Sequence, residues 1–120
     1  MTHATPLAVL EAYVEGSRRL DRDLLASCFH PQAVMAGDLA GALLIGGPEP
    51  FLSDIAGMAA AGVDHSGFVA QIADLDVTGR TAAGTVRSQG FGARFDFVDR
   101  FHLIETDAGW QIVSKNFTTA

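Results

Sequence analysis

The segment from Arg94 to Leu103 holds the residues whose types and spacing most readily suggest chemistry. Side chains alternate between the two faces of a strand, so each face of this segment can be read separately. One face carries Phe95, Phe97, Asp99, Phe101 and Leu103, and the other carries Arg94, Asp96, Val98, Arg100 and His102. A buried carboxylate is costly unless it is paired, hydrogen-bonded or protonated. Asp99 is therefore predicted either to contact a ligand in an apolar pocket or to form a structural pair.

Lys115, the only lysine of the chain, is one possible partner of Asp99. It lies in the segment that should pair with the Asp99 strand through a turn at residues 107–109. Depending on the type of that turn, Asn116 or Phe117 lies opposite Asp99. The pattern leaves open whether Lys115 reaches the carboxylate.

Three other polar residues are candidates for a site. Tyr13, the only tyrosine, lies on the apolar stripe of a predicted helix, where it is either a hydrogen-bond donor to the pocket or a core residue. Asp38 follows a short predicted strand, where it either lines a cavity mouth or acts as an ordinary turn residue. His30 precedes Pro31 and is interpreted first as a residue at the end of a helix.

The absence of several known motifs argues against other kinds of site. The chain has no zinc-ligand spacing among its histidines, no phosphate-binding loop and no dinucleotide fingerprint, so neither a metal nor a cofactor is expected. No nucleophile elbow of the Gly-x-Ser-x-Gly type occurs. Cys28 lies on a predicted buried helical stripe, where an inert thiol is expected. The four histidines, which lack zinc-ligand spacing, are His3, His30, His65 and His102.

The composition narrows the class of protein further. The 120 residues fit a single domain, residues 1–120, around one core. Fourteen acids and eight bases give a net charge of −6, which disfavours nucleic acid and anionic membranes as partners. No apolar run approaches the roughly 18 residues of a membrane span, and no secretory leader is recognised. With a single cysteine, a cytoplasmic location is the expectation.

The elements that must position these side chains are predicted from hydrophobic periodicity and turn signals. Helices come mostly first and long strands follow, which indicates an α+β fold with three N-terminal helices packed in a strongly curved, mostly antiparallel sheet. Helices are predicted over 6–19, after Asp21 as far as His30, and from Pro48 to Gly62. Strands are predicted over 33–37, 42–45, 64–77, 81–89, 93–105 and 110–118.

The order of elements and several motifs resemble the nuclear-transport-factor-2-like superfamily over nearly the whole chain. Within this superfamily, the residue pattern is most similar to that of the bacterial lumazine-binding-like branch. The resemblance rests on Ala12-Tyr13-Val14-Glu15, Asp21-Arg22-Asp23-Leu24-Leu25, Phe29-His30-Pro31-Gln32-Ala33, Val98-Asp99-Arg100-Phe101-His102-Leu103 and the segment from Gly109 to Phe117.

The resemblance implies a cone-shaped roll of the cystatin-like kind, with a pocket between sheet and helices and commonly a homodimer through the sheet. Ketosteroid isomerase and polyketide-cyclase-like proteins are more distant members. In the isomerase, a helix Tyr and a strand Asp form an oxyanion hole and a second Asp moves the proton. Tyr13 and Asp99 match the first two positions. Gly37 occupies the position of the second Asp, which moves the proton in the isomerase. Asp38 comes one residue later, and on a strand a shift of one residue places the side chain on the other face.

Three functional hypotheses fit these residues. The first is a homodimeric binding domain for a small apolar or aromatic ligand, with Tyr13 and Asp99 as polar anchors. The second is an isomerase, cyclase or dehydratase, in which Asp38 or His30 is the base while Tyr13 and protonated Asp99 stabilise an enolate. The third is an interaction module with a filled core. The predicted pocket walls are Phe29, Met35, Phe95, Phe97, Phe101 and Trp110.

Overall fold

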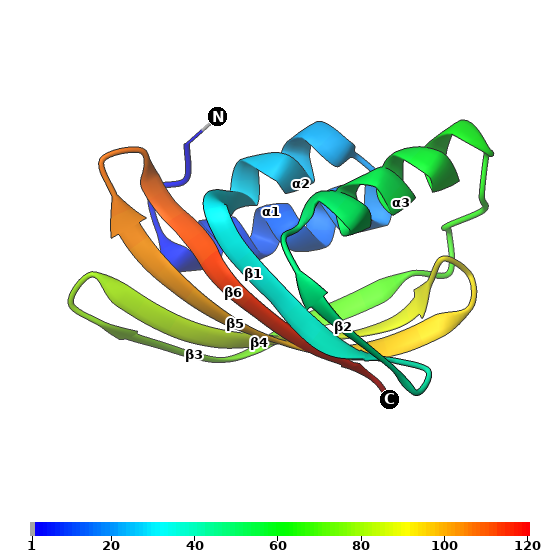
Figure 1. Ribbon diagram of the computed structural model, residues 1–120. Coiled ribbons are helices and arrows are strands. Elements are labelled where there is room, and N and C mark those ends of the chain that lie inside the picture. The colour runs from blue at the N-terminus through cyan, green and yellow to red at the C-terminus, as the bar shows by residue number, and fades with distance from the viewer. Residues whose placement is uncertain (1) are drawn as a thin grey trace.

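Three helices cover one face of a curved six-stranded sheet in the computed structural model, which describes residues 2–120 (Figure 1). The predicted α+β roll is confirmed. The helices are α1 (Pro6–Arg19), α2 (Arg22–Cys28) and α3 (Glu49–Ala60). The strands are β1 (Phe29–Leu39), β2 (Ala42–Gly46), β3 (Val69–Thr78), β4 (Thr81–Phe91), β5 (Phe95–Thr106) and β6 (Gly109–Thr119).

Local capping explains where the first two helices begin and end. The Thr5 hydroxyl accepts a hydrogen bond from the Ala8 amide at 3.0 Å, and Pro6 follows at the first helical position. Leu20 ends α1 in the left-handed conformation. One residue later, the Asp21 carboxylate accepts from the Leu24 amide at 3.0 Å and starts α2. Both helix starts agree with the sequence prediction.

The sheet has the strand order β2-β1-β6-β5-β4-β3. The strands from β3 to β6 form an antiparallel meander, β2 is antiparallel to β1, and only the β1–β6 pairing is parallel. The sheet stays open, with β2 and β3 as its edges. It is therefore a curved trough, and the helices lie within its curvature (Figure 1).

Two strands begin four or more residues away from their predicted starts. The prediction that the second helix extends to His30 is wrong, because α2 ends at Cys28 and His30 is the second residue of β1, which begins at Phe29. Pro31 is tolerated in this strand because the β1–β6 register shifts between Phe29 and Val34, so its missing amide hydrogen interrupts no regular pairing. β3 begins at Val69 rather than at residue 64. The residues before it form a turn in which the Phe68 amide donates to the His65 carbonyl at 3.1 Å.

A register shift in the last hairpin decides which β6 side chains face the helices. Near the turn, Leu103 lies opposite Ile112, but His102 lies opposite Ser114, so Val113 is an extra residue in β6. Beyond this bulge, Phe117 lies opposite Asp99. Without it, the alternation would place Asn116 there. The bulge therefore turns Lys115 and Phe117 onto the inner face of the sheet.

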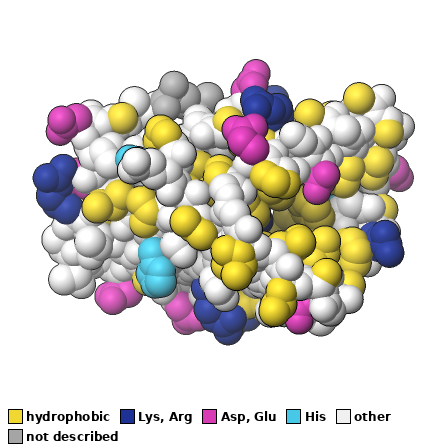
Figure 2. Space-filling model, viewed as in Figure 1, with side chains coloured by type: hydrophobic (Ala, Val, Ile, Leu, Met, Phe, Trp, Pro, Cys, Tyr) yellow, Lys and Arg dark blue, Asp and Glu magenta, His cyan; other side chains and the backbone are white. Residues whose placement is uncertain are grey.

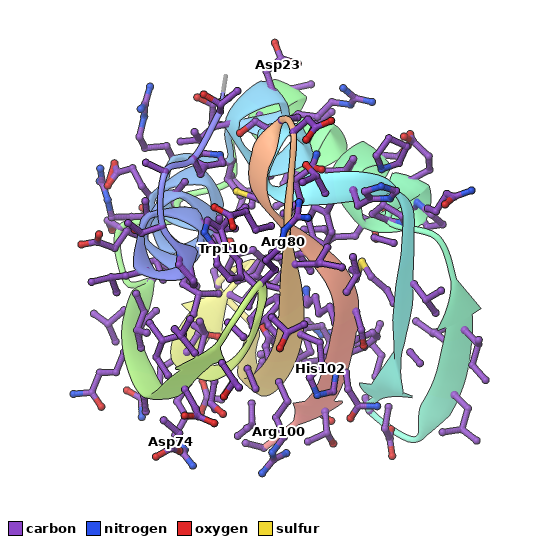
Figure 3. The ribbon with its side chains drawn as sticks, turned by 90° about the vertical axis from the view of Figure 1, so that its left-hand side faces the viewer. Asp23, Asp74, Arg80, Arg100, His102 and Trp110 are labelled. Atoms are coloured by element: carbon purple, nitrogen blue, oxygen red, sulfur yellow. The ribbon has the colours of Figure 1, made fainter. Side chains whose placement is uncertain are left out.

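The inner face of the sheet is buried and its outer face meets solvent. Side chains of β5 alternate accordingly: Phe101 and Leu103 are each 1 % exposed, whereas Arg100 and His102 are exposed. Figure 3 shows Arg100 and His102 pointing away from the helices. None of the helices in the described part of the chain is long and apolar enough to cross a membrane.

Candidate functional site

A cavity of about 680 Å³ lies between α3, β2 and the inner face of the sheet. Figure 2 shows it as a hollow bordered by hydrophobic side chains, with α3 above it and strands below. The cavity exists because α3 makes its main helix contact with α2 and stands off from the strands. The side chains of α3, including Phe51 and Met58, reach across part of this space.

The walls of the cavity are mainly apolar. Aromatic rings form a continuous series in which Phe51 stacks on Phe91 at 6.2 Å, and Phe97 lies 5.6 Å from Phe91 and 6.2 Å from Phe117. Apolar walls with few polar groups are typical of small-molecule sites. The polar or charged lining side chains are Ser53, Asp54, Ser88, Arg94, Asp99 and Lys115.

Asp99 lies on the inner cavity wall and is only 4 % exposed. The Tyr13 hydroxyl donates to its Oδ2 at 2.8 Å, so Asp99 has a structural partner. Its other oxygen, Oδ1, has no hydrogen-bond partner within the described chain. Asp99 is thus held from the core side by Tyr13, and its buried second oxygen atom keeps an unused hydrogen-bonding capacity.

Lys115 lies beside Asp99 on the same face, because it is directly opposite Phe101 in the adjacent strand. Its Nζ is 3.9 Å from the centre of the Phe51 ring and 5.1 Å from that of Tyr13. Among residues 2–120, no carboxylate oxygen lies within 4.0 Å of this nitrogen. Lys115 and Asp99 are therefore neighbours without being a contact ion pair.

Burial shifts these groups toward their uncharged forms. Desolvation raises the pKa of Asp99, although the nearby Lys115 and the Tyr13 hydrogen bond oppose the rise. Desolvation lowers the pKa of Lys115, and the Asp99 charge opposes that change. The pKa of Tyr13 is raised by burial first and by Asp99 second. Tyr13 consequently remains a hydrogen-bond donor at neutral pH.

The predicted site residues divide into cavity walls and core. Met35, Phe95, Phe97 and Asp99 line the cavity. The others, Tyr13, Phe29, Phe101 and Trp110, are buried in the packed core and are not part of the cavity wall among residues 2–120.

Trp110 is separated from the cavity by its position along β6. It lies opposite Glu105, and its backbone amide donates to the His3 carbonyl at 2.9 Å. Figure 3 shows it on the helix side of the sheet, near the turn that joins β5 and β6. Trp110 therefore packs at the opposite end of the inner face from Phe95.

The two candidate bases lie away from the cavity. Asp38 follows Gly37 on β1, and its Oδ1 accepts from the Gly41 amide at 2.6 Å, which is the turn role considered from the sequence. Its strand neighbour Leu39 faces the cavity, so Asp38 points the other way. The His30 Nδ1 accepts from the Gln32 amide at 3.0 Å. Within residues 2–120, no group of three or more His, Cys, Asp or Glu side chains could hold a metal ion.

Sequence reasoning missed several cavity residues. Phe51 and Met58 fall in the helix predicted from Pro48 to Gly62, and Phe91 falls between the strands predicted over 81–89 and 93–105, so none of them is among the predicted cavity walls. The signal for Phe51 and Met58 was present in that stripe, because a helix whose apolar face exceeds its contact with neighbouring helices must cover something else. Phe91 and Ser88 carried no such periodic signal.

This trough, with helices on its inner face and a cavity under the last helix, defines an α+β roll of the cystatin-like class. Residues 2–118 match the profile of the family described as putative lumazine-binding, so the chain belongs to that family within the nuclear-transport-factor-2-like superfamily. No curated protein matches the chain.

Several solved structures share the fold. A nuclear-transport-factor-2-like protein of unknown function from Silicibacter pomeroyi is 27% identical, with 95% of this chain and 92% of that chain covered and a TM-score of 0.80. One from Shewanella baltica is 26% identical, with 95% and 90% covered and a TM-score of 0.80. A cystatin-like domain from Nostoc punctiforme is 17% identical, with 94% and 74% covered and a TM-score of 0.70.

Proposed function

We propose that this protein binds a small molecule in the cavity under α3, and that the molecule has an apolar, ring-containing body and one uncharged hydrogen-bonding group. The observation that carries the proposal is the pairing of two features at one place. The walls are mainly apolar and include a series of phenylalanines. The inner end is lined by Asp99, whose buried Oδ1 has no hydrogen-bond partner among the described residues, and by Lys115, and these two side chains make no ion-pair contact.

The volume and chemistry of the cavity support this ligand class. A volume of about 680 Å³ lies within the range of roughly 300–1,000 Å³ typical of small-molecule sites. Membership of a family described as lumazine-binding also supports a ligand-binding role. The filled-core hypothesis fits less well, because it leaves this space unexplained.

Binding of the neutral fluorescent probe N-phenylnaphthylamine tests whether the cavity takes an apolar ring. Saturable binding with one probe per chain is expected. Gly57 lies on the cavity wall with open space beyond its Cα, so Gly57→Phe should fill part of the cavity. We expect it to weaken binding by about tenfold, which is the loss of ~1.4 kcal/mol.

Ala60→Phe is the matched control, since Ala60 is exposed on the same helix but does not line the cavity. It adds the same ring to the surface and should leave the affinity unchanged. Equal weakening by both variants, or no saturable binding to the wild-type chain, would contradict the proposal.

Displacement of the same probe tests whether the ligand needs a hydrogen-bonding group. Naphthol, with one hydroxyl, should compete about tenfold better than methylnaphthalene, because one or two hydrogen bonds contribute ~1 kcal/mol each. In Asp99→Leu this advantage should disappear while methylnaphthalene still competes. An unchanged preference in Asp99→Leu would place the polar contact elsewhere.

A proton-transfer enzyme is the second candidate, and the Tyr13–Asp99 hydrogen bond is the observation that favours it. Burial raises the pKa of Asp99, so its carboxyl group is suited to donate a hydrogen bond to a developing enolate oxygen. Exchange of the methyl protons of acetonaphthone in deuterated water, followed by NMR, tests this role. Exchange faster than the buffer rate, and lost in Asp99→Leu, would support it.

A further inference from the structure

The position of Lys115 differs from that of most lysines, whose long side chains carry the ammonium group to water. Lys115 is 5 % exposed and its nitrogen is surrounded by the rings of Phe51, Tyr13 and Phe117, at 3.9, 5.1 and 5.5 Å. It also lines the cavity, so a bound molecule can reach it. A buried amine exposed only to a cavity can act chemically on what the cavity holds.

We propose that Lys115 is a nucleophile that condenses with the carbonyl group of an apolar aldehyde or ketone bound in the cavity and forms an imine. The inference rests on the proposed binding function and adds a covalent step to it. Buried lysines in apolar pockets are suited to this chemistry because the neutral amine, not the ammonium ion, attacks carbonyl carbon.

Burial of Lys115 favours that neutral amine. Desolvation lowers the pKa of Lys115, whereas Asp99 acts in the opposite direction. Asp99 on β5 and Tyr13 on α1 are the titratable groups that face it, and the other charged groups of the cavity wall are Asp54 on α3 and Arg94 before β5. Burial also raises the pKa of Asp99, so both shifts act in the direction of moving one proton from lysine to aspartate.

The reaction balances without a further reagent. The lone pair of Lys115 Nζ forms a bond to the carbonyl carbon, the carbon–oxygen π bond breaks, and a proton passes from nitrogen to oxygen. Loss of the resulting hydroxyl as water, with one proton supplied by the Asp99 carboxyl group and one lost from nitrogen, leaves a carbon–nitrogen double bond. The proton lost from nitrogen returns to Asp99, so one aldehyde and one amine yield one imine and one water.

Asp99 is placed to supply the proton because its two oxygens have different surroundings. Oδ2 accepts from the Tyr13 hydroxyl at 2.8 Å, and Oδ1 has no partner among the described residues. The Tyr13 bond fixes the orientation of the carboxyl group from the core side. The free oxygen is then the one available to a hydroxyl group leaving from the adjacent carbon.

Reductive trapping tests the inference directly. The full chain is incubated with naphthaldehyde and cyanoborohydride at neutral pH, and the adduct is located by peptide mass spectrometry. Lys115 is the only lysine, so a covalent amine adduct can form only there or at the terminal amino group. We expect labelling at Lys115, and no labelling beyond the terminus in Lys115→Met.

A lysine in an ordinary environment is the matched control. Arg100 points from the outer face of β5 into solvent (Figure 3), so the double variant Lys115→Met/Arg100→Lys moves the single lysine to water. At neutral pH an exposed lysine has only about one amine in a thousand unprotonated. Wild-type Lys115 should therefore be trapped at least about tenfold faster than this control.

Each outcome decides a different claim. Fast trapping at Lys115 supports the inference, and loss of it in the presence of excess methylnaphthalene assigns the reaction to the cavity. Equal trapping rates for Lys115 and the surface lysine overturn the inference. Binding of N-phenylnaphthylamine without any adduct at Lys115 overturns the covalent step alone, whereas absence of both overturns the binding function as well.

Discussion

The two ends of the inner face of the sheet are built from the same strands but packed in different ways. At the closed end, near the β5–β6 turn, Leu103 and Ile112 are almost completely buried beneath the first two helices. At the open end, Phe95 and Phe97 are only partly buried and line the cavity under α3. The closed end excludes solvent by filling space, and the open end keeps a space that is apolar but accessible.

The difference shows how this fold separates stability from a binding site. The helix pair α1–α2 covers the closed end directly, while α3 is attached mainly to α2 and leaves the strands beneath it uncovered. Tyr13 and Asp99 lie at the boundary, because Tyr13 belongs to the packed core and its hydrogen-bond partner Asp99 lines the cavity. Substitutions on either side of that boundary should therefore have different consequences.

The largest expected contrast is between Leu103→Ala and Phe97→Ala, two residues on the same face of β5. Leu103 is fully packed, so its truncation should lower the free energy of unfolding by about 2–5 kcal/mol. Phe97 borders an existing space and should lose only about 1–2 kcal/mol despite its larger side chain. Urea unfolding of both variants measures the contrast. A larger loss for Phe97→Ala would mean that the open end is as tightly packed as the closed end.

Replacing the buried amine should raise stability. Lys115→Met keeps the apolar stem and removes the cost of holding a buried amine unprotonated, for which we expect a gain of about 1–3 kcal/mol at neutral pH. Since burial lowers the pKa of Lys115, the unfolded chain binds more protons than the folded one between that lowered value and the ordinary value of 10.5. Wild-type stability therefore rises with pH across this window, and the advantage of Lys115→Met should shrink as pH approaches 10.5.

Urea unfolding at a series of pH values checks this slope. The same series on Arg100→Met, where an exposed cation is lost, provides the control and should show no such trend. If the difference in free energy of unfolding between Lys115→Met and the wild type grew with pH, the pKa of Lys115 would have to be raised rather than lowered.

Asp99→Asn should change stability by less than about 1 kcal/mol. Asn keeps an oxygen for the Tyr13 hydroxyl, and the raised pKa of Asp99 favours a carboxyl group that already resembles a neutral amide. Denaturant unfolding at neutral pH measures the change. A loss of several kcal/mol would instead identify a broken buried ion pair, and would show that the Asp99 charge is needed for the fold.

Small effects of opposite sign are expected from adding one methyl group to a helix at each end. Gly57→Ala, with open space at its Cβ position, should gain about 0.5–1 kcal/mol from helix propensity. Gly16→Ala would place its Cβ 2.8 Å from Leu25 Cγ and should lose about 1 kcal/mol. Thermal unfolding distinguishes the two signs. A stabilising Gly16→Ala would show that Leu25 has room to move.

Local signals made much of the fold predictable. Thr5, Pro6 and Asp21 act on residues within one helical turn, so the starts of α1 and α2 follow from a few adjacent positions. The alternation along β5 likewise identified the face that carries Asp99. The homodimer and the cytoplasmic location, which rest on resemblance and composition, stay predictions.

The inner end of the cavity could not be predicted in the same way, because it depends on a bulge. Neither turn residue nor alternation indicates that Val113 is extra in β6, yet this one residue decides that Lys115 and Phe117 face inward. The position of Trp110 along β6, far from the cavity, depends on how the helices divide the sheet. The stand-off of α3 is a property of three-dimensional packing that no single stretch of sequence specifies.

Gly37 has a consequence for how this chain can evolve. A Cβ added there would lie 2.1 Å from the carbonyl oxygen of Phe117 and 2.6 Å from the Cγ of its ring. The position that the resemblance matches to the proton-transferring Asp of ketosteroid isomerase is therefore sterically closed in this chain. A carboxylate at position 37 becomes accessible only after Phe117 and its strand have moved. The two positions are thus epistatic, and the order of mutations would decide whether a descendant of this chain acquires that base.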